Sequence, residues 1–126
     1  MKFYEYEYEL NGETKVLKLR LVSSDMKTIE QRTKMSLLDY VSNPTITMIT
    51  DILRYMNRPN IPNYSEKDAD KLYDELVDAG LTLENIYLDI IMETLVVSGF
   101  MKKEELDAMK TKSQEEKKQK LETPSK

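Results

Sequence analysis

The chain has 126 residues, 33% of them charged, with 19 basic and 23 acidic side chains and a formal net charge of −4 at pH 7. This mixed, slightly acidic balance gives no general attraction to nucleic acid. The absence of histidine and cysteine removes the commonest general base, the thiol nucleophile and most zinc ligands. We therefore expect a non-enzymatic protein of a reducing compartment, without a cofactor or a metal.

No window of about 18 apolar residues is present, and the start, "MKFYEYEYEL", lacks the apolar core of a signal peptide. We therefore expect a soluble protein that stays in the cytoplasm where it is made and does not associate with membranes. Chain length and composition predict a single globular domain over residues 1–101, followed by a charged tail over residues 102–126.

Residues 3–22 predict a β-hairpin. Polar and apolar residues alternate strictly on both sides of an Asn-Gly pair, which is typical of a two-residue type I′ turn. Closing the hairpin on this turn pairs Tyr6 with Leu17 and Tyr4 with Leu19, so that one face is apolar. A two-stranded hairpin is only marginally stable in water, and we therefore expect helices to cover that face.

Apolar residues at helical spacing, interrupted by prolines, predict helices in the rest of the domain. Ser24, Thr45, Ser65 and Thr82 are the expected N-cap residues, and "MSLLDYV" predicts a further short turn or helix. The expected helices span residues 25–34, 45–57, 66–79 and 83–98. The predicted fold class is α+β and mainly α, with an N-terminal hairpin packed on a bundle of four to five helices and a charged C-terminal tail.

The helix expected over residues 83–98 is apolar around almost its whole circumference, apart from a narrow polar ridge. We expect this helix to be central and interpret the ridge as a water-facing stripe. Two rows at i, i+4, i+8 spacing could alternatively hold a divalent cation. These rows are Asp70, Asp74 and Asp78, and the ridge Asn85, Asp89 and Glu93. For the first row a solvated face with local lysine pairs is the preferred interpretation.

The segment "ETLVVSGFMKK" indicates a Schellman ending for this helix, with Gly99 in the left-handed position and Phe100 folded back against Leu95. After Lys102 the composition becomes rich in lysine and glutamate, with few sizeable apolar side chains. We expect the tail to begin as an exposed helix. From about Lys112 we expect a segment that is disordered or folds only on binding.

Eight methionines are present, and their flexible thioether side chains are typical of surfaces that accept an imperfect partner. Side chains at the flanks of two helical stripes and at the exit from the domain are candidates for a partner-binding groove. They are Met48, Tyr55, Leu88, Met92, Phe100 and Met101. Plain core filling is the alternative for each of them.

The order of these features resembles a known family. The hairpin ends in "LRLVSSD", and "KMSLLDYV", an Ile-rich helix and a proline loop follow. Next comes "YSEKDADKLYDELVDAGLTLENIYLDIIMETLVVSGFM". Over about residues 3–101 this arrangement is similar to the small tail assembly chaperones of long-tailed (siphovirus-type) phages and prophages of Gram-positive bacteria. In that family a "Y-x-x-L-x-D-x-G" helix end, here Tyr73 to Gly80, precedes a helix closing in "SGF".

The resemblance implies a non-enzymatic protein that binds the tape measure protein and keeps it soluble while tail tube protein polymerises around it. It also implies that the protein acts in the cytoplasm of the bacterial host and is not part of the mature virion. Self-association and a longer frameshifted form stay open, and no individual site residues carry over. The alternatives are a small phage or bacterial adaptor or regulatory protein that binds a helical partner, and a carboxylate-only, metal-dependent hydrolase.

Overall fold

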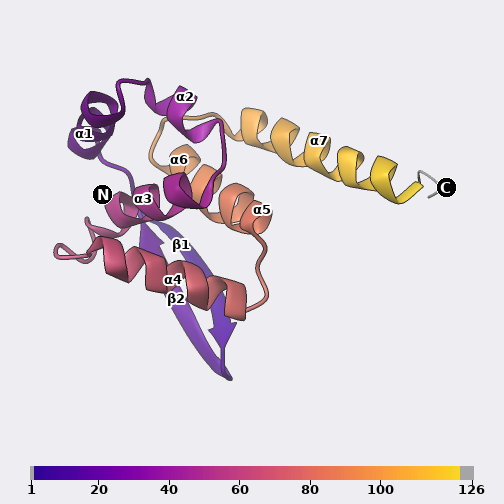
Figure 1. Ribbon diagram of the computed structural model, residues 1–126, viewed down its shortest axis with the longest axis horizontal. Coiled ribbons are helices and arrows are strands. Elements are labelled where there is room, and N and C mark those ends of the chain that lie inside the picture. The colour runs from indigo at the N-terminus through magenta and orange to yellow at the C-terminus, as the bar shows by residue number, and fades with distance from the viewer. Residues whose placement is uncertain (1, 123–126) are drawn as a thin grey trace.

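The computed structural model describes the backbone of residues 2–122 and the side chains of residues 2–116 (Figure 1). Two antiparallel strands, β1 (Tyr4–Leu10) and β2 (Glu13–Leu19), come first. The helical elements are α1 (Ser23–Thr33), α2 (Leu37–Val41), α3 (Ile46–Asn57), α4 (Glu66–Asp78), α5 (Leu83–Asn85), η1 (Ile86–Met92), α6 (Glu93–Val97) and α7 (Lys103–Glu122). This arrangement confirms the predicted fold class, α+β and mainly α.

The hairpin has the register that its sequence predicts. Tyr6 lies opposite Leu17, and the turn residues Asn11 and Gly12 both have positive φ, at 53° and 81°. A type I′ turn requires positive φ at both of these positions. The turn therefore fixes which side chains share the apolar face.

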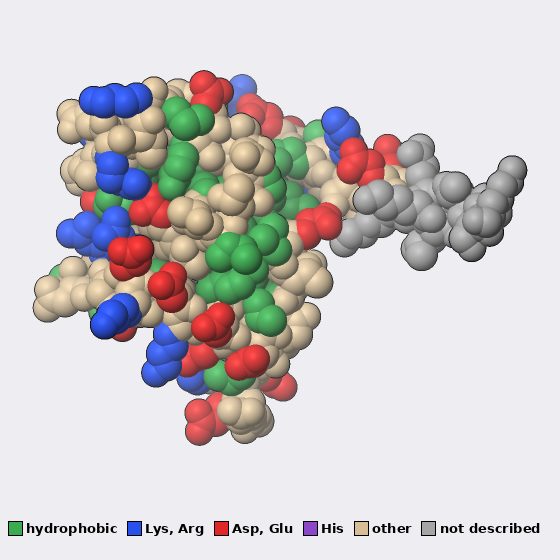
Figure 2. All heavy atoms as spheres, viewed as in Figure 1, with side chains coloured by type: hydrophobic (Ala, Val, Ile, Leu, Met, Phe, Trp, Pro, Cys, Tyr) green, Lys and Arg blue, Asp and Glu red, His purple; other side chains and the backbone are tan. Residues whose placement is uncertain are grey.

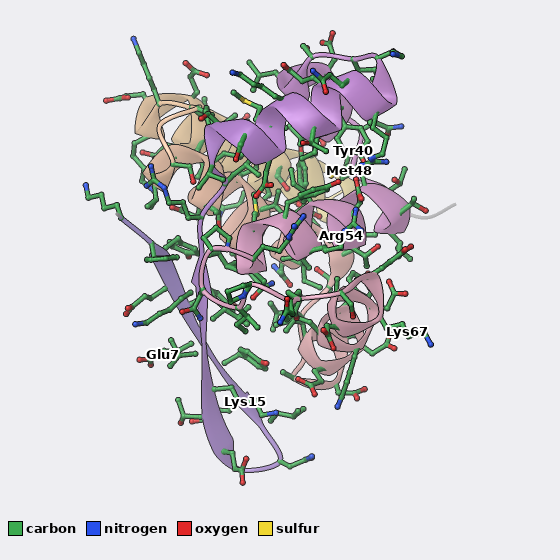
Figure 3. All side chains as sticks on the ribbon, turned by 90° about the vertical axis from the view of Figure 1, so that its left-hand side faces the viewer. Glu7, Lys15, Tyr40, Met48, Arg54 and Lys67 are labelled. Atoms are coloured by element: carbon green, nitrogen blue, oxygen red, sulfur yellow. The ribbon has the colours of Figure 1, made fainter. Side chains whose placement is uncertain are left out.

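Helices cover one face of the hairpin, as expected. β1 contacts α4 and α6, and β2 contacts α3. On the covered face Leu19 is fully buried and Tyr8 nearly so. Lys15 Nζ lies 3.7 Å from Glu75 Oε2 at the rim, and Figure 3 shows Lys15 on the side of α4 while Glu7 points away from the helices. The hairpin is thus half-buried, with its glutamates in solvent.

Local capping sets most helix starts. Side-chain oxygens accept backbone N–H bonds at three of the four expected N-cap positions, namely Thr45, Ser65 and Thr82. The prediction for Ser24 is wrong, because Ser24 lies inside α1 and Val22 occupies the cap position without a side-chain bond. The backbone N–H of Leu21 donates to Ser98 Oγ at 3.0 Å, so a contact distant in sequence holds the chain where α1 begins.

The last helix of the domain is not the regular α-helix expected over residues 83–98. It consists of α5, the π-helical segment η1 and α6, which ends at Val97. The buried residues of η1 are Ile86, Tyr87, Ile90, Ile91 and Met92. Apolar residues at so many neighbouring positions are compatible with either winding, so their spacing did not distinguish a π-helix from an α-helix.

The end of α6 has the predicted Schellman geometry. The N–H of Phe100 donates to the carbonyl of Leu95 at 2.9 Å, and the N–H of Gly99 donates to Val96 at 3.0 Å. Gly99 has a φ of +88°. These bonds satisfy carbonyl groups that the helix end would otherwise leave open, and they turn the chain toward α7.

The tail differs from its prediction. α7 continues as a helix to Glu122, whereas a segment that is disordered or folds only on binding was expected from about Lys112. Lysine and glutamate have high helix propensity and pair favourably one turn apart, which favours a helix in this segment. Residues 123–126 lie outside the described part of the chain. None of the helices within residues 2–122 combines the length and the apolar character needed to cross a bilayer.

Replacement of Gly99 by alanine should lower the free energy of unfolding by about 1 kcal/mol, because a side chain at positive φ is strained. A Cβ atom at Gly99 meets no heavy atom within 4 Å, so backbone strain alone produces the loss. Urea unfolding measures it. Gly99→Asn is the matched control and should lose less, since asparagine tolerates this conformation better. Equal stability of Gly99→Ala and the parent chain would contradict the role of this turn.

Candidate helix-binding site

The six residues expected to bind a partner do not form one groove. Three of them are core residues, with exposed fractions of 2%, 4% and 1%: Met48, Tyr55 and Met92. The other three are partly buried against the same core: Leu88, Phe100 and Met101. α3 contacts β2, α2, α4 and η1, so both flanks of its apolar stripe are covered. Core filling, the alternative interpretation, therefore holds for the first three.

α7 packs on the polar ridge of the last helix of the domain, and this contact defines a different surface. The side chains that meet α7 come from α5, η1 and α6, and we call them the α7 seat: Glu84, Asn85, Leu88, Asp89 and Glu93. Leu106 of α7 is fully buried, and Met109 is partly buried against the core. Beyond these first turns α7 extends away from the body (Figure 1). The seat thus holds one side of the first half of α7, whose apolar contacts are Leu106 and Met109.

Ion pairs join α7 to the ridge. The carboxylate of Glu93 accepts hydrogen bonds from Lys110 at 2.7 Å and from Lys103 at 3.1 Å, and the side chain of Glu93 is only 15% exposed. Lys110 Nζ also lies 3.5 Å from Asp89 Oδ1, and Ser113 donates to Glu84. The interpretation of the ridge as a water-facing stripe is therefore wrong for Glu93, because its carboxylate lies beneath α7.

The two lysines keep Glu93 ionised. Burial opposes its charge, but the hydrogen bonds from Lys110 and Lys103 outweigh burial and hold the pKa of Glu93 below its ordinary value of 4.5. The same bond to Glu93 raises the pKa of Lys103. The charged forms of both partners thus favour the docked position of α7.

The seat also has an apolar part that α7 does not fill. A cavity of about 440 Å³ lies between α7 and the body, with Pro44, Tyr87 and Leu88 on one side and Met109 on the other. The hydroxyl of Tyr87 donates to the carbonyl of Val41 at 2.7 Å, which fixes this wall of the cavity. The cavity is open to solvent, so apolar surface beside α7 stays accessible.

A second hollow, of about 490 Å³, lies between α3 and α4. At one end Asp51 accepts a hydrogen bond from Tyr40 at 2.7 Å and further bonds from Arg32 and Arg54. Burial and the bond to Asp51 raise the pKa of Tyr40 to about 12. Tyr40 and Arg54 lie on the same side of the molecule in Figure 3. The charges at this end are largely paired with one another.

Two exposed apolar side chains lie where α3 begins and α4 ends. α3 and α4 run antiparallel, joined by residues 58–65, so Ile46 at the start of α3 and Val77 near the end of α4 lie at the same end of the pair. Their side chains are 54% and 45% exposed. Figure 2 shows a cluster of hydrophobic side chains over this end. The sequence did not predict this cluster, because candidate residues were chosen from their positions within single helices. The cluster depends on how one helix packs on another.

The acidic rows give no support for a metal centre. Asp70, Asp74 and Asp78 are exposed along α4, and Glu93 is engaged by lysines. Within residues 2–122, no group of three or more potential metal ligands comes together in a way that could hold an ion.

Comparison of the chain with protein-family models, with curated proteins and with solved structures gives no match. The resemblance to tail assembly chaperones therefore stays a prediction. Support for a function comes from the geometry of the α7 seat.

Acidification should release α7. The folded-state pKa of Glu93 is lowered, so its contribution to docking is complete above the ordinary value of 4.5 and is lost as pH falls through the lower, folded-state value. Amide hydrogen exchange over residues 103–113, followed from about pH 6 to about pH 3, measures the loss.

Glu93→Gln is the matched control for this titration. It should weaken protection of α7 about fivefold near neutral pH and remove most of the acid-dependent step. An unchanged step in this variant would show that another carboxylate controls docking.

Proposed function

We propose that the protein is a non-enzymatic tail assembly chaperone of a long-tailed phage or prophage. In this role it binds the tape measure protein and keeps it soluble while tail tube protein assembles around it. The observation that supports the proposal is the α7 seat, because the body there holds one side of an amphipathic helix through apolar and acidic side chains. A long helical client exposes the same kind of surface before the tube encloses it.

The mechanism follows from the size of the surface. One domain covers only a few helical turns of a client, so each contact is weak and several copies bind along one client molecule. Weak individual contacts allow tube protein to replace the copies one after another. The formal charge of −4 on each copy helps keep a decorated client in solution.

The proposal places the protein in the cytoplasm of the bacterial host and outside the mature virion. Leu88 is the predicted partner-binding residue that it uses most directly, since Leu88 lines the cavity beside α7. Phe100 and Met101 lie at the junction of the body and α7, where a bound client would pass close by. Contact with tail tube protein and self-association belong to the same proposal.

Co-expression tests the function. The tagged protein should retain fragments of the long helical product encoded next to its gene and raise their soluble yield severalfold. Leu88→Glu should reduce retention at least about tenfold, because it places a charge in the apolar part of the seat. Lys67→Glu on the exposed face of α4 is the matched control and should retain the fragments normally.

Two outcomes would contradict this account. If the fragments stay insoluble and are not retained, the chaperone proposal fails. If the protein instead retains an unrelated helical partner through Leu88, the adaptor alternative is correct.

A further inference from the structure

We propose that the α7 seat is itself the client-binding groove, and that α7 occupies it as a built-in competitor which a client helix displaces. The identity of the client rests on the proposed function, whereas the chemistry of the groove rests on the contacts of α7 alone. The ligand class is a basic amphipathic helix.

The seated face of α7 specifies this ligand. Leu106 and Met109 stand three residues apart and supply its apolar contacts. Lys103 lies three residues before Leu106 and Lys110 lies four residues after it, and both reach the carboxylate of Glu93. A fitting client segment therefore presents two large apolar side chains at i and i+3, with lysine or arginine at i−3 and i+4.

The charge of the seat gives selectivity. Asp89 and Glu93 both lie within 3.5 Å of Lys110 Nζ, and Glu84 accepts a hydrogen bond from Ser113. A helix with acidic residues at the flanking positions would bring like charges together over these carboxylates. The groove should therefore discriminate against acidic helices of equal hydrophobicity.

α7 can leave the seat without dismantling the core. Among the described residues, Leu106 is the single fully buried hydrophobic side chain that α7 contributes, and the rest of the core comes from β1 through α6. The cavity beside Met109 leaves part of the interface unfilled. After Ser113 the described side chains of α7 are exposed, and the helix extends away from the body (Figure 1).

The short connection between α6 and α7 makes the competition strong but not absolute. A helix tethered over residues 98–102 has a high effective concentration at its own seat, so a single free helix displaces it poorly. A client that carries several matching segments and meets several copies of the protein gains avidity. The competitor thus restricts stable binding to long, repetitive clients.

The test uses the full chain and a synthetic peptide with the sequence of residues 101–114, titrated by NMR, which detects weak binding at Leu88, Asp89 and Glu93. The variant Lys103→Ala/Lys110→Ala weakens the binding of α7 to the seat and leaves the seat residues unchanged. It should bind the peptide about fivefold more tightly than the parent chain. A peptide with glutamate in place of its two flanking lysines is the matched ligand control and should not bind.

Glu93→Gln completes a thermodynamic cycle. In the parent chain this replacement weakens the binding of α7 and of the peptide to the seat equally. The apparent affinity for the peptide, which competes with α7, should therefore stay nearly unchanged. In the Lys103→Ala/Lys110→Ala background only the peptide uses Glu93, and its affinity should fall about fivefold. An equal effect of Glu93→Gln in both backgrounds, or no gain from the lysine replacements, overturns the proposal.

A covalent cross-link between α7 and the seat provides a second test if a charge variant misfolds. The chain has no cysteine, so Glu84→Cys/Ser113→Cys can be joined specifically by a short methanethiosulfonate cross-linker. The locked protein should lose peptide binding, and reduction should restore it. Equal binding before and after reduction overturns the proposal.

The groove and the proposed function can fail independently of each other. If tape measure fragments are retained but the peptide does not bind at the seat, the groove is assigned wrongly and the chaperone function stands. If the peptide binds as expected but the fragments are not retained, the groove stands and the chaperone function fails.

Discussion

The apolar face of the hairpin has to be covered, and this requirement organises the rest of the structure. A two-stranded sheet cannot stand alone in water, and α3, α4 and α6 provide its cover. The hydroxyl of Tyr4 donates to the carbonyl of Asp89 at 2.8 Å, which ties β1 to η1, and burial raises the pKa of Tyr4 to about 12. The N–H of Arg20 donates to Met56 at 3.0 Å and ties the end of β2 to α3. With one side of η1 and α6 bound to the hairpin, their polar ridge meets α7.

The α7 seat combines two interactions of different strength. Burial of Leu106 contributes about 2 kcal/mol, whereas the ion pairs are partly exposed and add less. A domain of this size has a total stability of about 5–15 kcal/mol, so docking of α7 is a minor part of it. Loss of the α7 contacts should therefore leave the body folded, as the proposed competition for the seat requires.

Local rules explain what the sequence could predict. The hairpin register follows from the turn at Asn11, and the end of α6 follows from Gly99, because both depend on a few adjacent residues. Met48 and Met92 were placed at a partner surface, although neighbouring helices cover them completely. The burial of Glu93 beneath α7 depends likewise on how separate segments meet, and no spacing within one helix reveals it. The position of the α7 seat was therefore not predictable from the sequence.

The central claim is that a client helix and α7 compete for one seat, and a distance measurement in the complex tests it most directly. Nitroxide labels at Asn43→Cys and Gln114→Cys, in a chain without other cysteines, report the separation of α7 from the body by pulsed electron paramagnetic resonance. In the free protein the account predicts one short, narrow distance distribution. Addition of a retained tape measure fragment should replace it with a longer and broader distribution. An unchanged distribution with the fragment bound would contradict displacement of α7.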